Sequence, residues 1–206
     1  MIRRAPQLRP GALAGAAVVL CLLATACGGS SGGGSDLQPA DVQRFVLAKE
    51  ATDHLTRLVQ LTATADDSIS TLAGQEPGSA VAGRTIDGGL TGWNNVLVGL
   101  GNFTPAQAAT GDGLTDAILA NRAVAINWSN VLGDLKAHPP ATKAAMLQKM
   151  KTARAKELKA RGLLVTAAAS LAKTVCTLER AHPELAPAGA AQSDCANADR
   201  LAQAAG

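Results

Sequence analysis

Residues 51–72 read ATDHLTRLVQLTATADDSISTL, and the spacing of their small and apolar side chains predicts the fold. These side chains recur alternately four and three residues apart, at Ala51, Leu55, Leu58, Thr62, Ala65, Ile69 and Leu72. Such a spacing places them on one stripe of an α-helix, whereas a half-buried strand would alternate with period two. We therefore predict a long helix from Pro39 or Ala40 to about Leu72, with one continuous buried stripe.

Three further segments have the composition and spacing of long helices. They are residues 79–100, 104–137 and 142–181, and residues rich in Gly or Pro separate them. Ala and Leu dominate the chain, and no stretch alternates with period two. We predict an all-α fold, an antiparallel up-and-down bundle of four long helices with a short last helix at about residues 190–204. Two helical hairpins that pack loosely are the alternative.

Some residues within these segments leave local questions open. The second segment contains five glycines, which reflect either a compositional bias or a close helix approach or kink. They are Gly83, Gly88, Gly89, Gly92 and Gly99. The run from Gly111 to Gly113 can interrupt the third helix. Asn121 and Glu157 lie on inward stripes, so we expect Asn121 to fix the register and Glu157 to have a polar partner or a water-filled gap.

The first 38 residues have the organisation of an export signal followed by a tether. A short basic start with three arginines precedes an apolar run over residues 11–26. A spanning helix needs about 20 apolar residues, so this run is too short and fits a signal peptide instead. Cys27 follows directly, and residues 28–35 are all Gly or Ser. A tract of that composition is a flexible spacer.

The junction of Leu23, Ala24, Thr25, Ala26 and Cys27 resembles the lipobox of bacterial lipoproteins, with the leucine one position earlier than in the commonest pattern. The resemblance implies a signal peptide over residues 1–26, a diacylglycerol on the sulfur of Cys27, and a tether over residues 27–38. A domain over residues 39–206 would then lie at the outer face of the bacterial cell membrane. Cleavage after Ala26 by general signal peptidase, which would give a soluble secreted protein, is the alternative.

Charge is balanced overall but not along the chain. Residues 1–26 contain three arginines and no acid, so the mature chain has 16 basic and 16 acidic side chains. This balance excludes a general basic attraction to nucleic acid. Residues 36–134 hold 11 acids and 5 bases, and residues 135–206 hold 5 acids and 11 bases. The basic stretch 143–161 either pairs with the acidic half or faces anionic lipid or an envelope polymer, and the spread of its bases around the helix favours a solvated face.

Two cysteines remain in the predicted domain. Cys176 lies late in the fourth helix and Cys195 lies in the last, whereas Cys21 is lost with the signal. Two cysteines in an exported chain indicate a disulfide, and they are too few for a zinc site. We therefore predict that the Cys176–Cys195 bond ties the last helix to the fourth.

The sequence contains no motif that indicates catalysis, such as a nucleophile elbow, a P-loop or a metalloprotease pair of histidines. Glu50 and His54 lie one helical turn apart, but two ligands do not make a metal site. Counting from a turn near Phe103, Trp93 and Trp128 lie about 22 Å apart in height, so we expect each to pack separately in the core.

We therefore predict a non-catalytic helical binding or scaffold module, anchored to the membrane by its lipid, with no cofactor and no metal. The sequence does not identify its partner, for which another envelope protein is one candidate. The alternative is a sensor or carrier of a small ligand, with a cleft between the second and third helices.

Overall fold

The structure, a computed structural model, describes residues 37–186 and 189–205. The predicted signal peptide (1–26), Cys27 and most of the predicted tether therefore lie outside the described residues. All regular secondary structure in the described part is helical, which confirms the all-α prediction.

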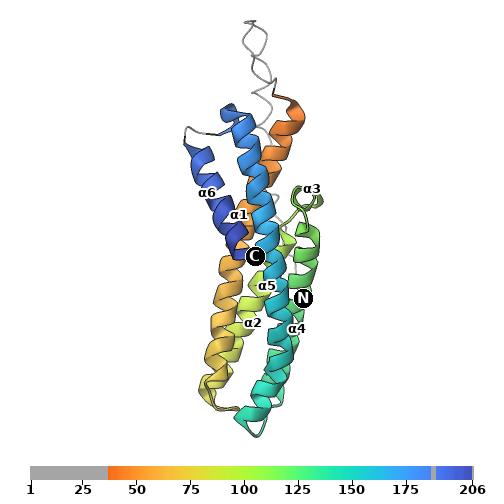
Figure 1. The fold of residues 1–206 in the computed structure, drawn as a ribbon. Coiled ribbons are helices and arrows are strands. Elements are labelled where there is room, and N and C mark those ends of the chain that lie inside the picture. Colours follow the sequence, from red (N-terminus) through yellow and green to blue (C-terminus); the bar gives the residue numbers. More distant parts are fainter. Residues whose placement is uncertain (1–36, 187–188, 206) are drawn as a thin grey trace, which may run out of the picture. The chain divides into compact units, whose positions relative to one another are not determined.

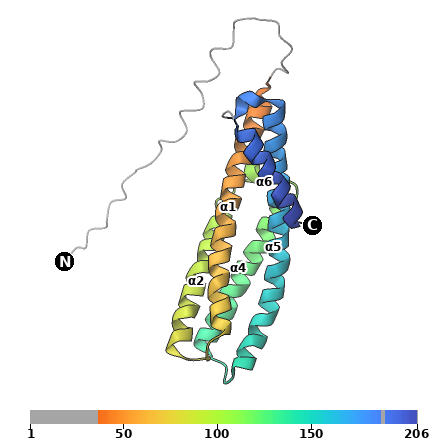
Figure 2. The same ribbon diagram turned by 60° about the vertical axis from the view of Figure 1, so that its left-hand side comes forward.

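The described residues form α1 (Pro39–Ala73), α2 (Ala80–Gly101), α3 (Pro105–Ala108), α4 (Leu114–Ala137), α5 (Lys143–Ala181), a 3-10 turn (Pro183–Leu185) and α6 (Ala190–Ala205). In Figures 1 and 2, α1 runs down the molecule, α2 runs up, α4 runs down and α5 runs up again. Helix α1 packs against α2 and α5, and α4 also packs against both. Helix α6 packs along the C-terminal half of α5.

The long helices differ in length, and this difference shapes one end of the molecule. Helices α1 and α5 have 35 and 39 residues, whereas α2 and α4 have 22 and 24. At 1.5 Å per residue, α1 and α5 are therefore about 20 Å longer than their neighbours. They extend beyond α2 and α4 at the end where α6 lies (Figure 1). At that end α6 packs against the part of α5 that α2 and α4 are too short to cover.

Helices α2, α3 and α5 begin at a side-chain cap. The Ser79 side chain accepts a hydrogen bond from the Ala82 amide (3.1 Å), and the Thr142 side chain accepts one from the Ala145 amide (3.2 Å). Thr104 and Gln107 form the reciprocal capping box of α3.

The third predicted helix, 104–137, is divided into α3 and α4, and the break includes the run from Gly111 to Gly113, where the sequence left an interruption open. Gly113 has a φ of 72° and starts α4, and few residues other than glycine adopt this angle. A Cβ at Gly111 would lie 2.7 Å from Leu171 Cγ, so the turn packs directly against α5. Gly111 and Gly113 thus let the chain leave α3 and re-enter a helix beside α5.

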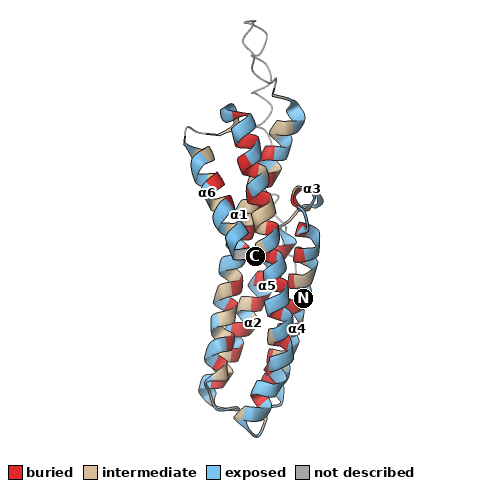
Figure 3. Ribbon diagram, in the orientation of Figure 1, coloured by how far each residue is buried: buried red, intermediate tan, exposed pale blue. Residues whose placement is uncertain are grey.

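The core is a continuous cluster of mostly aliphatic buried residues contributed by α1, α2, α4 and α5 (Figure 3). All seven residues of the stripe over 51–72 are buried, as predicted. The stripe contains alanines, so the helices approach closely. A Cβ at Gly92 of α2 would lie 3.0 Å from Ala65 Cα of α1. At Gly89 and Gly92, therefore, the glycines serve close packing, whereas at Gly83 nothing lies near.

One described helix, α5, is long and apolar enough over part of its length to cross a membrane by length and composition alone. Core helices of soluble proteins pass the same test, and 44% of the apolar window is buried inside the bundle. The apolar character of α5 is therefore explained by its packing against α1, α4 and α6.

Candidate functional site

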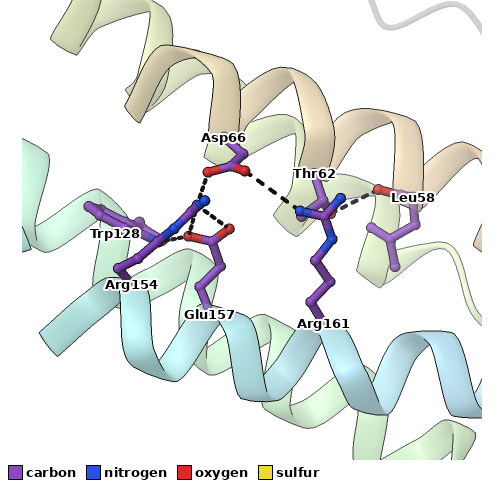
Figure 4. A network of polar contacts seen from close by, with 7 residues as sticks. All are labelled: Leu58, Thr62, Asp66, Trp128, Arg154, Glu157 and Arg161. Carbon is purple, nitrogen blue, oxygen red and sulfur yellow. Dashed lines mark hydrogen bonds and ion pairs between the residues drawn. The ribbon is translucent and has the colours of Figure 1, made fainter. Parts of the chain in front are cut away.

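A network of polar side chains joins α1, α4 and α5 (Figure 4). Glu157 of α5 is 1% exposed, and its Oε2 accepts a hydrogen bond from Trp128 Nε1 of α4 at 3.0 Å. Arg154 donates to both oxygens of Glu157, at 2.9 and 3.0 Å, and also to Asp66 of α1. Arg161 lies 3.6 Å from the second oxygen of Asp66. The prediction that Glu157 has a polar partner is confirmed.

This network makes a buried charge tolerable. A buried carboxylate without partners would cost several kcal/mol, whereas Glu157 has an arginine and an indole N–H. Arg154 is about one third exposed, so it joins the buried carboxylate to solvent. The arrangement fixes how α4 and α5 lie against α1 and leaves no free nucleophile or base in the network.

A second polar contact sets the register of α4 and α5. Asn121 is 3% exposed, and its Nδ2 donates to the carbonyl oxygen of Ala160 across the helix interface at 2.9 Å. It also donates to Ala117 within its own helix at 2.8 Å. The contact to Ala160 is the register function that its position on the stripe predicted.

The two tryptophans stack, which corrects the prediction of a 22 Å separation. The rings of Trp93 and Trp128 lie 6.1 Å apart at an interplanar angle of 14°, and both side chains are buried. The prediction counted both positions from one turn near Phe103, but α4 starts only at Leu114, after α3 and a loop. This intervening segment lets α4 start further along the bundle. The prediction that both rings pack in the core is confirmed.

Opposite charges from the two halves of the sequence meet in several places. Asp66 contacts Arg154 and Arg161, and Asp87 contacts Lys136 at 2.5 Å. The Lys149 ammonium lies 2.6 Å from Asp134 and holds the pKa of that carboxyl below its usual value. These pairs support the interpretation that the acidic and basic halves pair with each other.

Helix α6 is joined to the rest of the protein by a covalent bond and an ion pair. Cys176 and Cys195 form the predicted disulfide, with Cα atoms 4.8 Å apart. Lys49 of α1 lies 2.7 Å from Asp194 of α6 and 3.9 Å from Glu179 of α5. The Glu179 side chain is fully buried. Its burial, together with the nearby Asp194 carboxylate, raises its pKa to about 7.

Glu50 and His54, one turn apart on α1, hold the α3 segment. Glu50 Oε2 accepts a hydrogen bond from Gln107 Nε2 at 2.8 Å. The His54 ring packs edge-on against Phe103, with centroids 5.4 Å apart. The described residues contain no group of three or more His, Cys, Asp or Glu side chains that could hold a metal ion.

A groove of about 580 Å³ lies on the outer side of the α4–α5 interface. Its lining combines small and aliphatic side chains with two amides and two amines. The residues are Ala120, Ala123, Val124, Ile126, Asn127, Asn130, Lys156, Lys159, Ala160 and Leu163. Ligand sites commonly have volumes of about 300–1,000 Å³ and an apolar lining with few polar groups, so this groove, although widely open to solvent, is a candidate site.

The sequence placed a ligand cleft on the other side of α4, between it and α2. That interface is filled at the tryptophan pair and at Leu132, which is fully buried. A Cβ at Gly89 of α2 would lie 3.0 Å from Leu132 Cδ1. The groove between α4 and α5 is therefore the better candidate site.

In the sequence, Asn127 and Asn130 lie close to Trp128, and Lys156 and Lys159 belong to the basic stretch 143–161, but their spacing does not show that the four side chains line one groove. A weak signal was present. Ala120 and Ala123 on α4 and Ala160 on α5 are small, and small side chains at a helix interface leave room for a groove.

The fold and the groove define an all-helical protein with a candidate binding surface on one helix pair. Comparison of the chain with protein-family models, with curated proteins and with solved structures finds no match.

Proposed function

We propose that this chain is a lipoprotein of the bacterial cell envelope, anchored at the outer face of the cell membrane through Cys27. The observation that carries the proposal is the junction of Leu23 to Cys27, followed by Gly and Ser up to residue 35. Two acyl chains on one cysteine give a stable anchor, and palmitate is one such chain. The Gly/Ser tract holds the domain clear of the headgroups.

We further propose that the anchored domain is a non-catalytic module that binds or scaffolds another envelope protein. Its four long helices form an antiparallel up-and-down bundle, and α6 is a strap tied by the Cys176–Cys195 bond. The charged groups of the network in Figure 4 are occupied by one another, which supports a structural role rather than catalysis.

The anchor is tested by labelling cells with a palmitate analogue and separating membrane from soluble protein. Wild-type protein should be labelled and found in the membrane fraction, and Cys27→Ala should abolish both properties. The matched control is Cys21→Ala, which removes a thiol from the same signal peptide but leaves the junction intact. Unlabelled wild-type protein in the soluble fraction would refute the anchor and favour secretion.

The alternative function is a carrier or sensor of a small ligand. The specific observation in its favour is the groove between α4 and α5. Copurification of a second envelope protein with the wild-type chain favours the scaffold, whereas a bound small molecule in native mass spectrometry favours the carrier.

A further inference from the structure

The groove between α4 and α5 has two chemically different ends. Its register follows from Trp128, which bonds to Glu157, and from Asn121, which bonds to Ala160. Because the helices run antiparallel, higher numbers on α4 face lower numbers on α5.

The polar end, nearer the α4–α5 turn, therefore holds Asn127, Asn130 and Lys156. The apolar end, farther from the turn, holds Ala120, Ala123 and Leu163. Lys159 lies between them. Ten residues of α4, from Ala120 to Asn130, span about 15 Å along the groove.

The polar end has donors without acceptors. Lys156 and Lys159 are exposed, and neither forms an ion pair with any of residues 37–186 or 189–203. Other bases of the same helix, such as Lys149 and Arg154, do have acidic partners. No acidic side chain lines the groove. Two amines and two amides therefore offer a site for a carboxylate or phosphate group.

Two large aliphatic side chains of the groove are partly exposed. Leu163 of α5 lies at the apolar end and is 39% exposed, and Ile126 of α4 lies beside Asn127, between the two ends, and is 46% exposed. The floor of the groove is lined by Ala120, Ala123 and Ala160, whose small side chains leave the space between the two helices unfilled. A hydrocarbon chain lying on this floor would bury the two aliphatic side chains.

We propose that this groove binds a single-chain anionic amphiphile, a fatty-acid carboxylate in the simplest case. The acidic head lies at the polar end, and the chain lies along the apolar end. The inference rests on the carrier alternative and does not depend on acylation of Cys27, which is measured separately. Charge complementarity selects the anion, and the length and lining of the groove select a single chain.

The test uses chain 27–206 with Cys27→Ala, which keeps the whole described unit with its own core and disulfide. Dodecanoate is titrated calorimetrically below its micelle concentration. We expect one saturable site per chain. A trimethylammonium amphiphile with the same dodecyl chain should not bind, because it would meet Lys156 and Lys159 with a like charge.

Two variants locate the site. The double variant Lys156→Gln, Lys159→Gln should weaken dodecanoate binding about tenfold or more, because each lysine supplies a charge-assisted bond. The matched control, Lys151→Gln with Lys173→Gln, removes the same charge from the same helix outside the groove and should bind like the parent. Ala123→Phe should abolish binding, because the new ring occupies the floor of the groove at an exposed position.

Absence of dodecanoate binding would overturn the inference, and so would equal weakening by the two lysine pairs. Binding that survives Ala123→Phe would also overturn it, since the chain would then not use the groove. A sedimentation assay with vesicles of anionic phospholipid tests whether the same surface binds a membrane instead. If the chain binds these vesicles through the two lysines but does not bind monomeric dodecanoate, the surface contacts a membrane and the inference fails. A wild-type chain that binds dodecanoate but is not acylated at Cys27 would refute only the anchor.

Discussion

Replacement of Gly92 by alanine tests whether α1 and α2 are held together by backbone contact. The added Cβ would lie 3.0 Å from Cα and 3.1 Å from Cβ of Ala65, and Ala65 is fully buried. Neither atom can rotate away, so α1 and α2 must separate slightly along their shared interface. Gly88, one turn earlier on the same helix, is the matched control, because a Cβ there would lie 3.8 Å from Ser68 Oγ, an ordinary contact.

The magnitude follows from two opposing effects. Alanine is favoured over glycine in a helix interior by up to about 1 kcal/mol, and this gain applies at both positions. Extra volume in a well-packed interface costs about 1–3 kcal/mol, and this cost applies only at Gly92. We therefore expect Gly88→Ala to stabilise the protein. Gly92→Ala should be less stable than Gly88→Ala by about 1–3 kcal/mol, because the helix-propensity gain is the same in both variants and cancels in their difference.

The assay is denaturant unfolding followed by far-ultraviolet circular dichroism, supported by thermal melts. For a domain of this size each kcal/mol corresponds to about 2–4 °C in Tm, so the difference between the two variants is measurable. Equal stabilities of Gly88→Ala and Gly92→Ala would refute the close contact. Unequal stabilities with an unchanged denaturant slope would confirm that the difference lies in packing rather than in the unfolded state.

Three further predictions concern the buried charges and the last helix. Glu157→Gln should destabilise the protein by about 1–3 kcal/mol in denaturant unfolding, because its arginine partner loses a buried counter-charge, whereas the exposed control Glu76→Gln should change stability by less than about 0.5 kcal/mol. Equal effects of the two would contradict the network. Reduction of the Cys176–Cys195 bond should accelerate hydrogen exchange in α6 before the core, and unchanged exchange there would contradict a tethering role. Because the pKa of Glu179 is raised to about 7 from 4.5, the folded state retains a proton that the unfolded state loses. Stability should therefore fall as the pH rises from about 5 to about 8, by up to about 3 kcal/mol, and Glu179→Gln should remove most of this fall.

The helices could be predicted because their stripes are long and the breaks between them are strong. The stripe of α1 alone contains seven residues that follow one another at alternating intervals of four and three. The division between α3 and α4 was open, because Gly111 to Gly113 fit both a continuous and an interrupted helix. What decides it is the contact of Gly111 with Leu171, a residue far away in the sequence.

The candidate groove could not be predicted for a related reason. It depends on how α4 and α5 slide against each other, and one residue of slip would move Lys156 away from Asn127. Asn121 indicates that a register is fixed, but only its bond to Ala160 shows which one. The error over the tryptophans has the same origin, because their relative height depends on a loop whose path the sequence does not specify.

The stacked pair of tryptophans also gives this protein an unusual optical signature. The chain has two tryptophans and no tyrosine, so its near-ultraviolet absorption and its fluorescence come almost entirely from this pair. The two rings lie 6.1 Å apart in a buried, chiral setting. Their transitions therefore couple, and the near-ultraviolet dichroism should show a paired band that vanishes as soon as α2 and α4 separate. Since Trp128 is bonded to Glu157 and adjoins Asn127 in the chain, emission from the same pair reports on the ion network and on the wall of the groove without any added label.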